Sequence, residues 1–172
     1  MVEVTLAAEA DRQDLATVLR AMAAQEDDPW ETGAPARVAA ELSAPAGRVG
    51  PFCFLARDAG RPVGFAAFSG LLPVTQGRWA LFLQLLFVVP EARGRGVPEA
   101  RGRGASRALM GALARFTRDR GYARLDWNAV PGNAPATGLY ASLGVPVFDR
   151  LYYRLAGDRL AEAARTWPEP IR

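Results

Sequence analysis

Hydrophobic residues recur along the chain with the two periods that distinguish strands from helices. Val2 to Leu6 alternates between apolar and polar side chains, which is typical of a strand with one buried face. Residues 14 to 22 and residues 105 to 116 carry apolar side chains at helical spacing. The run from Trp79 to Val89 is almost continuously apolar and therefore predicts a central strand that is buried on both faces.

Turn and capping residues separate these segments. Asp58 and Gly60 mark a hairpin turn between two apolar strands, and Asn133 before Pro135 is a favourable helix start. The expected strands are 2–6, 52–57, 62–71, 79–89, 122–127 and 145–155, and the expected helices are 14–22, 36–42, 104–120, 133–143 and 158–165. This order predicts an α/β (α+β) fold in which helices flank one central sheet.

Length and composition indicate one domain, residues 1–172. A chain of 172 residues with 50% hydrophobic residues can bury a sizeable core without disulfides or metals. No apolar run approaches the roughly 20 residues of a membrane span, and the N-terminus lacks a basic region followed by an apolar one. We therefore expect a soluble, cytoplasmic protein with no membrane partner.

The types of charged and reactive residues exclude several kinds of chemistry. The net charge is +3 and every basic residue is arginine, but the arginines are dispersed, so a polyanionic cofactor explains the bias without nucleic acid. The chain has no histidine, which excludes histidine triads, histidine-bound metals and a histidine base, and we expect no metal site. The single cysteine, Cys53, lies in an apolar strand and is expected to be inert core.

A loop of arginine and glycine follows the central strand and is written twice. The sequence Val-Pro-Glu-Ala-Arg-Gly-Arg-Gly fills residues 89–96 and again residues 97–104, and an amphipathic helix follows. Glycines let backbone N–H groups approach a phosphate, and a helix N-terminus adds partial positive charge. The pattern therefore predicts a pyrophosphate cradle, with a plain basic loop as the alternative. It lacks the Gly-Lys-Ser/Thr ending of a Walker loop and the glycine spacing of a dinucleotide fold.

The two copies of this octapeptide differ only in their neighbours. Residues 89–96 join the strand directly, whereas residues 97–104 join the helix that supplies the dipole. We therefore expect the second copy to form the cradle and the surplus residues to loop out, with Arg93 and Arg95 left in solvent. Because the copies are identical, the surplus can loop out at any register.

Two motifs resemble the signatures of the GNAT superfamily of N-acetyltransferases. The segment Arg101-Gly102-Arg103-Gly104-Ala105-Ser106 is similar to the arginine/glutamine-x-x-glycine-x-glycine/alanine signature that holds the pyrophosphate of acetyl-CoA, with Ser106 at the last small position. The segment from Asn133 to Tyr140 is similar to the asparagine-x-x-alanine-x-x-leucine/phenylalanine-tyrosine signature. The resemblance covers roughly residues 51 to 155, and within the superfamily it is closest to the diamine (spermidine/spermine-type) acetyltransferases.

This resemblance implies a fold, a cofactor and a set of site residues. The implied GNAT fold has a mixed, mostly antiparallel sheet of about six or seven strands, splayed at strands 4 and 5, and the implied cofactor is acetyl-CoA. Tyr140 would protonate the CoA sulfur, and the protein would be a homodimer. Residues implied in cofactor binding are Leu86, Phe87, Val88, Arg101, Gly102, Arg103, Gly104, Ala105, Ser106, Asn133 and Ala136.

The chain departs from the diamine acetyltransferases at two places. Those enzymes carry a Glu-Asp pair where this chain has Gln84 and Leu85, and a tryptophan where it has Gly132. Gln84 occupies a catalytic position but has no titratable proton, so it cannot act as a general base. Water, or another carboxylate such as Glu26, would then deprotonate the amine.

An acidic loop near residue 30 offers candidate acceptor-binding groups. Glu26, Asp27, Asp28 and Trp30 would form a lip that attracts a cationic amine, or else a solvated loop before a proline turn. We therefore predict acetyl-CoA-dependent N-acetylation of a primary amine of a small molecule by direct transfer. The alternatives are acetylation of protein N-termini or amino-acid-like compounds, and non-catalytic binding of acyl-CoA.

Overall fold

A computed structural model describes residues 1–25, 30–72, 77–93, 104–149 and 151–167. Contacts within the chain divide it into two units, Met1–Leu139 and Tyr140–Arg172. The first unit contains the sheet and the helices that cover it, and the second contains the end of one helix and a C-terminal helix. No helix in the described ranges combines the length and hydropathy needed to cross a bilayer.

The described residues form one mixed five-stranded sheet in the order β1-β2-β3-β4-β5. Strands β1 to β4 pair with one another in antiparallel fashion, and β5 runs parallel to β4. The strands are β1 (Val2–Leu6), β2 (Phe52–Asp58), β3 (Arg61–Leu71), β4 (Ala80–Val88) and β5 (Leu125–Trp127). The helices are η1 (Glu9–Asp11), α1 (Arg12–Ala23), α2 (Ala34–Ser43), η2 (Pro90–Ala92), α3 (Ala105–Asp119), α4 (Ala134–Ser142) and α5 (Gly157–Thr166).

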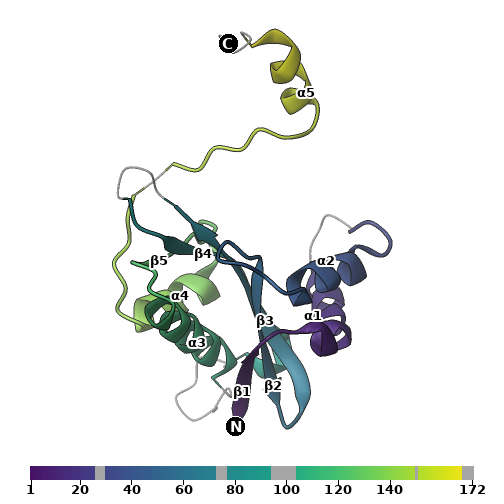
Figure 1. Cartoon of the computed structure of the whole chain (residues 1–172), viewed down its shortest axis with the longest axis vertical. Helices are drawn as coiled ribbons and strands as arrows, with labels where there is room; N and C mark the ends of the chain where they lie inside the picture. The colour runs from purple at the N-terminus through teal and green to yellow at the C-terminus, as the bar shows by residue number, and fades with distance from the viewer. Residues whose placement is uncertain (26–29, 73–76, 94–103, 150, 168–172) are drawn as a thin grey trace. The chain divides into compact units, whose positions relative to one another are not determined.

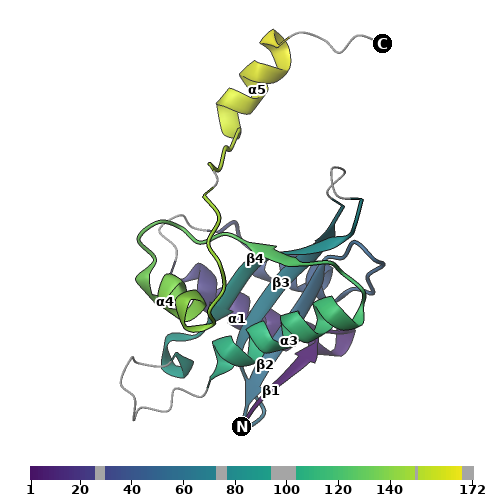
Figure 2. The same ribbon diagram turned by 90° about the vertical axis from the view of Figure 1, so that its left-hand side faces the viewer.

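Helices cover both faces of this sheet, with α1 and α2 on one face and α3 on the other (Figures 1 and 2). Successive strand side chains point to opposite faces, so each strand supplies two different cores. On the first face Leu55, Phe65 and Phe87 pack with the apolar sides of α1 and α2. The nearly continuous apolar pattern of the middle strands is explained by these two covered faces.

The second face is organised around Phe116 of α3. Its ring lies 5.3 Å from the ring of Phe52, 5.7 Å from that of Phe54 and 5.3 Å from that of Phe68, measured between centroids. All three contacts are edge-to-face, a geometry worth about 0.5–1.5 kcal/mol per pair beyond the area that it buries. This cluster fixes α3 against the sheet, and with it the start of the helix where the phosphate cradle is expected.

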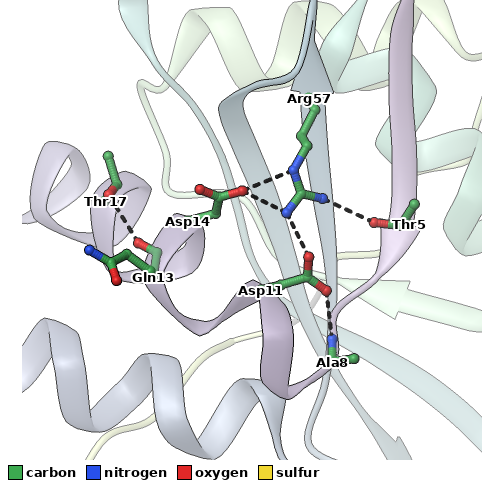
Figure 3. A network of polar contacts seen from close by, with 7 residues as sticks. All are labelled: Thr5, Ala8, Asp11, Gln13, Asp14, Thr17 and Arg57. Carbon is green, nitrogen blue, oxygen red and sulfur yellow. Dashed lines mark hydrogen bonds and ion pairs between the residues drawn. The ribbon is translucent and has the colours of Figure 1, made fainter.

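A polar network connects β1 and β2 to the N-terminal helices η1 and α1 (Figure 3). The Arg57 guanidinium on β2 donates to Asp11 at 2.6 Å, to Asp14 at 2.6 and 3.0 Å, and to Thr5 at 3.4 Å. Burial alone would raise the pKa of Asp11, but hydrogen bonds from the Ala8 N–H and from Arg57 outweigh it and lower that pKa. The network therefore joins β1, β2 and α1 through charged, hydrogen-bonded groups.

Most predicted elements are confirmed within one or two residues, but one strand is shorter than predicted and another strand prediction is wrong. The strand expected at 122–127 is confirmed only at Leu125–Trp127, which pair with β4. The expected strand 145–155 is wrong for residues 145–149 and 151–155, which belong to no strand, and residue 150 lies outside the described residues. The described sheet therefore has five strands, rather than the expected six or seven.

Candidate active site

A β-bulge interrupts β4 at Gln84. In the pairing with β3, Ala67 lies opposite Leu85 and Phe68 lies opposite Leu83, so Gln84 is the extra residue. Its side chain is exposed, and its Nε2 donates to the Ser69 hydroxyl at 3.3 Å. Bulges of this kind end the pairing locally and re-aim side chains beside active sites. Gln84, the position expected to be catalytic, therefore lies at a local distortion of β4.

Beyond this bulge the pairing between β4 and β5 ends, as the expected splay at strands 4 and 5 requires. Within the described residues β5 pairs with β4 only at Leu81, Phe82 and Leu83, so the edge of β4 from Gln84 to Val88 has no strand beside it. This edge exposes backbone hydrogen-bonding groups that another extended chain can use.

The register determines which residues present their backbone groups to the open edge. The Val89 N–H donates to the Val63 carbonyl at 2.9 Å, and residues along an antiparallel ladder alternate between facing the partner and facing away. The N–H and C=O groups of Phe87 therefore face β3, whereas those of Leu86 and Val88 face the open edge. Of the three residues expected to pair with pantetheine, Leu86 and Val88 are suitably oriented, and Phe87 packs in the core instead.

Gly64 allows β3 to lie close against the end of this edge strand. A Cβ atom at Gly64 would lie 2.6 Å from the Phe87 carbonyl oxygen and 2.9 Å from Val88 Cγ2. Contacts this short do not occur in real structures, so any side chain here would displace β4. The glycine therefore keeps the open edge in its place.

The N-terminus of α3 has the features of an anion site. Gly104 precedes the helix with φ +68°, a left-handed conformation that favours glycine, and a Cβ there would meet only open space. Its carbonyl accepts from the Ala108 N–H at 2.7 Å, and no described side chain caps the helix. The N–H groups of Ala105 and Ser106, in the first turn, therefore lack partners within the helix and add to its positive end.

The two copies of the octapeptide are only partly described. The first copy is described from Val89 to Arg93 and contains η2 (Pro90–Ala92). The second copy is described only at Gly104. Arg101, Gly102 and Arg103 lie outside the described residues, as do Glu26, Asp27 and Asp28. Whether the second copy alone forms the cradle therefore stays a prediction.

Arg93 is exposed, as expected, but its side chain has defined partners instead of extending freely into solvent. Its Nε donates to the Val88 carbonyl at 2.6 Å, and its Nη2 donates to Gln25 Oε1 at 3.0 Å. The guanidinium also lies 5.4 Å from the centre of the Phe87 ring. Arg93 was missed because a single arginine in a basic loop carries no local signal of its partners.

The second signature forms the start of α4. Asn133 Oδ1 accepts from the Ala136 N–H at 3.2 Å, which confirms the predicted N-cap. Because this hydrogen bond occupies the Ala136 N–H, that group stabilises the first turn of α4. Four residues expected on one face of the helix are half-buried, while their neighbours are exposed: Ala136, Leu139, Tyr140 and Leu143.

Tyr140 is the candidate proton donor and belongs to the second unit. It is half-buried, and burial raises the pKa of its hydroxyl above the ordinary value. A tyrosine with a pKa above about 10 keeps its proton at pH 7 and can donate it. The protonation state therefore suits the expected role.

Two other candidates are buried further than a binding role requires. Trp30, expected to be exposed in the acceptor lip, is half-buried and packs against the core cluster of α1 and α2. Cys53 is buried, and burial raises the pKa of its thiol to about 12, so it is not a nucleophile at neutral pH. The inert role predicted for Cys53 is confirmed.

Comparison with known proteins identifies the family. Residues 15–97 and 98–145 match the model of the acetyltransferase (GNAT) family. The chain belongs to the GNAT family. It is therefore an acetyl-CoA-dependent N-acetyltransferase, and the predicted GNAT fold is confirmed. No curated protein sequence matches the chain.

Solved structures agree with the GNAT fold. An integron cassette protein from V. cholerae is 23% identical, with a TM-score of 0.76 over 96% of this chain and 98% of its own. A ribosomal-protein-alanine N-acetyltransferase from Brucella melitensis is 23% identical, with a TM-score of 0.68 over 91% and 100%. An aminoglycoside N-acetyltransferase solved with CoA is 20% identical, with a TM-score of 0.68 over 90% and 94%.

The residues present fit the cofactor of a GNAT enzyme at two places. The open edge of β4 offers the backbone groups of Leu86 and the N–H of Val88, which match the amides of pantetheine, whereas the Val88 carbonyl already accepts from Arg93. The left-handed Gly104 and the first-turn N–H groups of α3 match a pyrophosphate. Both features were expected from the sequence, the first from the family resemblance and the second from the glycine and helix pattern.

Proposed function

We propose that this GNAT enzyme acetylates a primary amine of a small molecule, polyamine-like or similar, by direct transfer. The observation that carries the proposal is the bulged, one-sided edge of β4, where the exposed Gln84 amide lies at the start of the open segment. Acetyl-CoA would supply an activated thioester to this edge. Direct transfer agrees with the burial of Cys53, the chain's single thiol, because no acyl-cysteine can form on an inaccessible group.

Gln84 would orient the acceptor rather than deprotonate it. Its Nε2 is engaged by Ser69, which leaves Oε1 as an acceptor for an amine N–H. Proton removal then falls to water or to a carboxylate, with Glu26 as the proposed group. Glu26, Asp27 and Asp28 would also attract the cationic amine electrostatically, and Trp30 would support their loop from the core.

Tyr140 would complete the transfer by giving its phenolic proton to the departing sulfur. Its raised pKa keeps the hydroxyl protonated throughout the neutral range. Positioning by Leu86, Val88 and the α3 N-terminus would supply much of the remaining rate, because it brings the two reactants together in one orientation.

We also propose that the enzyme is most similar to the diamine acetyltransferases and that it forms a homodimer, as the same family resemblance implies. Two of the similar structures have names that state an aminoglycoside or the alanine of a ribosomal protein as substrate. These substrates share an amine and differ in size and charge. An experiment on the acceptor should therefore compare amines of these kinds.

Release of free thiol from acetyl-CoA in the presence of an amine panel tests the proposed acceptor. The panel contains spermidine, an aminoglycoside and a short peptide with an N-terminal alanine, at equal concentrations. We expect thiol release with spermidine and little release with the peptide. Release with the peptide alone would establish the protein N-terminus as the acceptor, and acetyl-CoA binding without release by any amine would favour a non-catalytic binder.

A further inference from the structure

An ion pair on β5 lies beside the bulged strand β4. The Arg124 Nε donates to Asp126 Oδ2 at 2.7 Å, and the two side chains are 32% and 40% exposed, so solvent reaches both. The Leu81 N–H donates to the Arg124 carbonyl at 2.9 Å, which extends the pairing of β4 with β5 to Arg124. Because Arg124 and Asp126 are two positions apart on extended chain, their side chains leave the sheet on the same face.

The strand register shows which face this is. Asp126 lies opposite Phe82 on β4, and Phe82 lies opposite Ser69 on β3. Residues opposite each other in a ladder share a face. Ser69 also shares a face with Phe65, four positions earlier on β3, whose ring packs in the core with α1 and α2. The ion pair is therefore on the α1 and α2 side of the sheet, opposite the face that α3 covers.

Gln84 is on the same face of the sheet. Its Nε2 donates to the Ser69 hydroxyl at 3.3 Å. Because Gln84 follows Phe82 by two residues, it lies diagonally across the two strands from Asp126. For strands about 4.8 Å apart and a rise of about 3.3 Å per residue, this diagonal is roughly 8 Å between backbones. The separation is comparable to the length of a short diamine.

The helices leave this part of the face accessible. α1 packs on β3 and α2 packs on β2, so their main contacts are with the strands farther from β5. Gln84 is exposed, and Phe82 and Asp126 are half-buried. The accessible surface therefore carries an amide, an apolar ring and a carboxylate on two neighbouring strands.

We propose that Asp126 determines acceptor specificity by binding a second ammonium group of the acceptor, while the amine to be acetylated lies at Gln84. This inference rests on the proposed function, which places the reactive amine at Gln84. Arg124 holds Oδ2 of the carboxylate, and Oδ1 accepts from the ammonium, because an ionised carboxylate can accept several hydrogen bonds. The methylene groups between the two amines lie on Phe82. The preferred acceptor is thus a diamine rather than a monoamine.

A comparison of putrescine with butylamine, which has the same carbon chain and one amine, tests this specificity. We expect a KM about tenfold lower for putrescine, the range of one charge-assisted hydrogen bond. Asp126→Asn keeps the shape and removes the charge, so it should raise the putrescine KM about tenfold. The butylamine KM, kcat and the acetyl-CoA dissociation constant should change by less than about twofold.

Two further variants control for the loss of charge. The double variant Arg124→Gln with Asp126→Asn leaves no unpaired arginine at the site, and it should also lose the preference for putrescine. Asp119→Asn removes the carboxylate from another exposed arginine–aspartate pair, formed with Arg118 at the end of α3. Asp119→Asn should therefore match the unmodified protein.

Calorimetric titration of both amines into the CoA-bound protein supplies a readout that does not depend on turnover. We expect putrescine to bind about tenfold more tightly than butylamine, and Asp126→Asn to remove the difference. Equal affinities for the two amines, a preference that survives in Asp126→Asn, or an equal loss for both amines would each overturn the proposal. If the unmodified enzyme acetylates no amine, the proposed function is wrong, and the titration still decides whether Asp126 binds an ammonium group.

Discussion

Replacing Tyr140 with phenylalanine is expected to lower kcat about a hundredfold, the lower end of what a positioned proton donor contributes. The substitution removes only the hydroxyl, so the ring still fills its half-buried place on α4. The acetyl-CoA dissociation constant should stay almost unchanged, because the proton matters only when the thiolate departs. Steady-state kinetics together with calorimetric titration of acetyl-CoA separate these two quantities.

A second tyrosine of the same unit provides the control for this experiment. Tyr152 is 70% exposed, and Tyr152→Phe should leave both kcat and acetyl-CoA affinity unchanged. If Tyr140→Phe also leaves turnover unchanged, Tyr140 has a packing role and the leaving sulfur obtains its proton elsewhere. A fall in turnover with an equal fall in affinity would indicate damage to the helix rather than loss of a proton donor.

Gly104→Val is expected to weaken acetyl-CoA binding by at least tenfold. Gly104 has φ +68°, and a side chain in this left-handed conformation costs roughly 1–2 kcal/mol, more for a β-branched residue. The helix start can relieve that strain only by moving, which redirects the N–H groups of Ala105 and Ser106. A Cβ at Gly104 would meet only open space, so the expected loss comes from backbone strain and not from a clash within the chain.

The duplicated sequence contains its own matched control. Gly96 ends the first copy as Gly104 ends the second, so Gly96→Val makes the same chemical change in the same octapeptide. We expect it to affect the acetyl-CoA dissociation constant far less, as measured by calorimetry on variants with comparable Tm. Equal losses at the two glycines would mean that the second copy is not the preferred cradle.

Elements fixed by local chemistry could be predicted from the sequence. β1 has the predicted bounds, and α3 begins directly after Gly104 as its glycine and apolar spacing indicated. The N-cap at Asn133 and the half-buried face of α4 also follow from nearby residues. In each case the deciding interaction lies within a few positions along the chain, where periodicity and capping preferences operate.

Elements that depend on distant partners could not be predicted in this way. The segment 145–155 has the apolar pattern of a strand, but that pattern does not supply a neighbouring ladder. Arg57 showed no local signal, although it binds Asp11 and Asp14 across more than forty residues. Trp30 looked exposed in an acidic loop, yet its ring packs against the core of α1 and α2.

The same distinction, between features set by nearby residues and features set by distant partners, holds for the candidate site. The left-handed Gly104 before α3 and the open edge at Leu86 and Val88 lie where the motifs indicated, while their roles in binding the cofactor stay predictions. The orientation of Phe87 toward β3 depends on the register with a second strand, which no motif specifies. The bonds of Arg93 join residues from three parts of the chain, so only the folded structure could show them.

The most direct test of a single phosphate cradle at the start of α3 removes the duplication. Deletion of Val97–Gly104 leaves one octapeptide joined to Ala105, with Arg93 still following η2. If the surplus residues loop out passively, the end of β4 and the start of α3 keep their relative position. Loop length then matters only through closure entropy, about 0.6 kcal/mol for each doubling.

The account therefore predicts that the deletion changes the acetyl-CoA dissociation constant and the turnover number by less than about threefold, the equivalent of that entropy. Calorimetric titration and thiol release on the full-length and deleted proteins give both values. A gain of tenfold or more in either quantity would show that the duplication displaces the start of α3 from the edge of β4. Loss of binding would show that both copies hold the cofactor, which would contradict a single cradle at the α3 N-terminus.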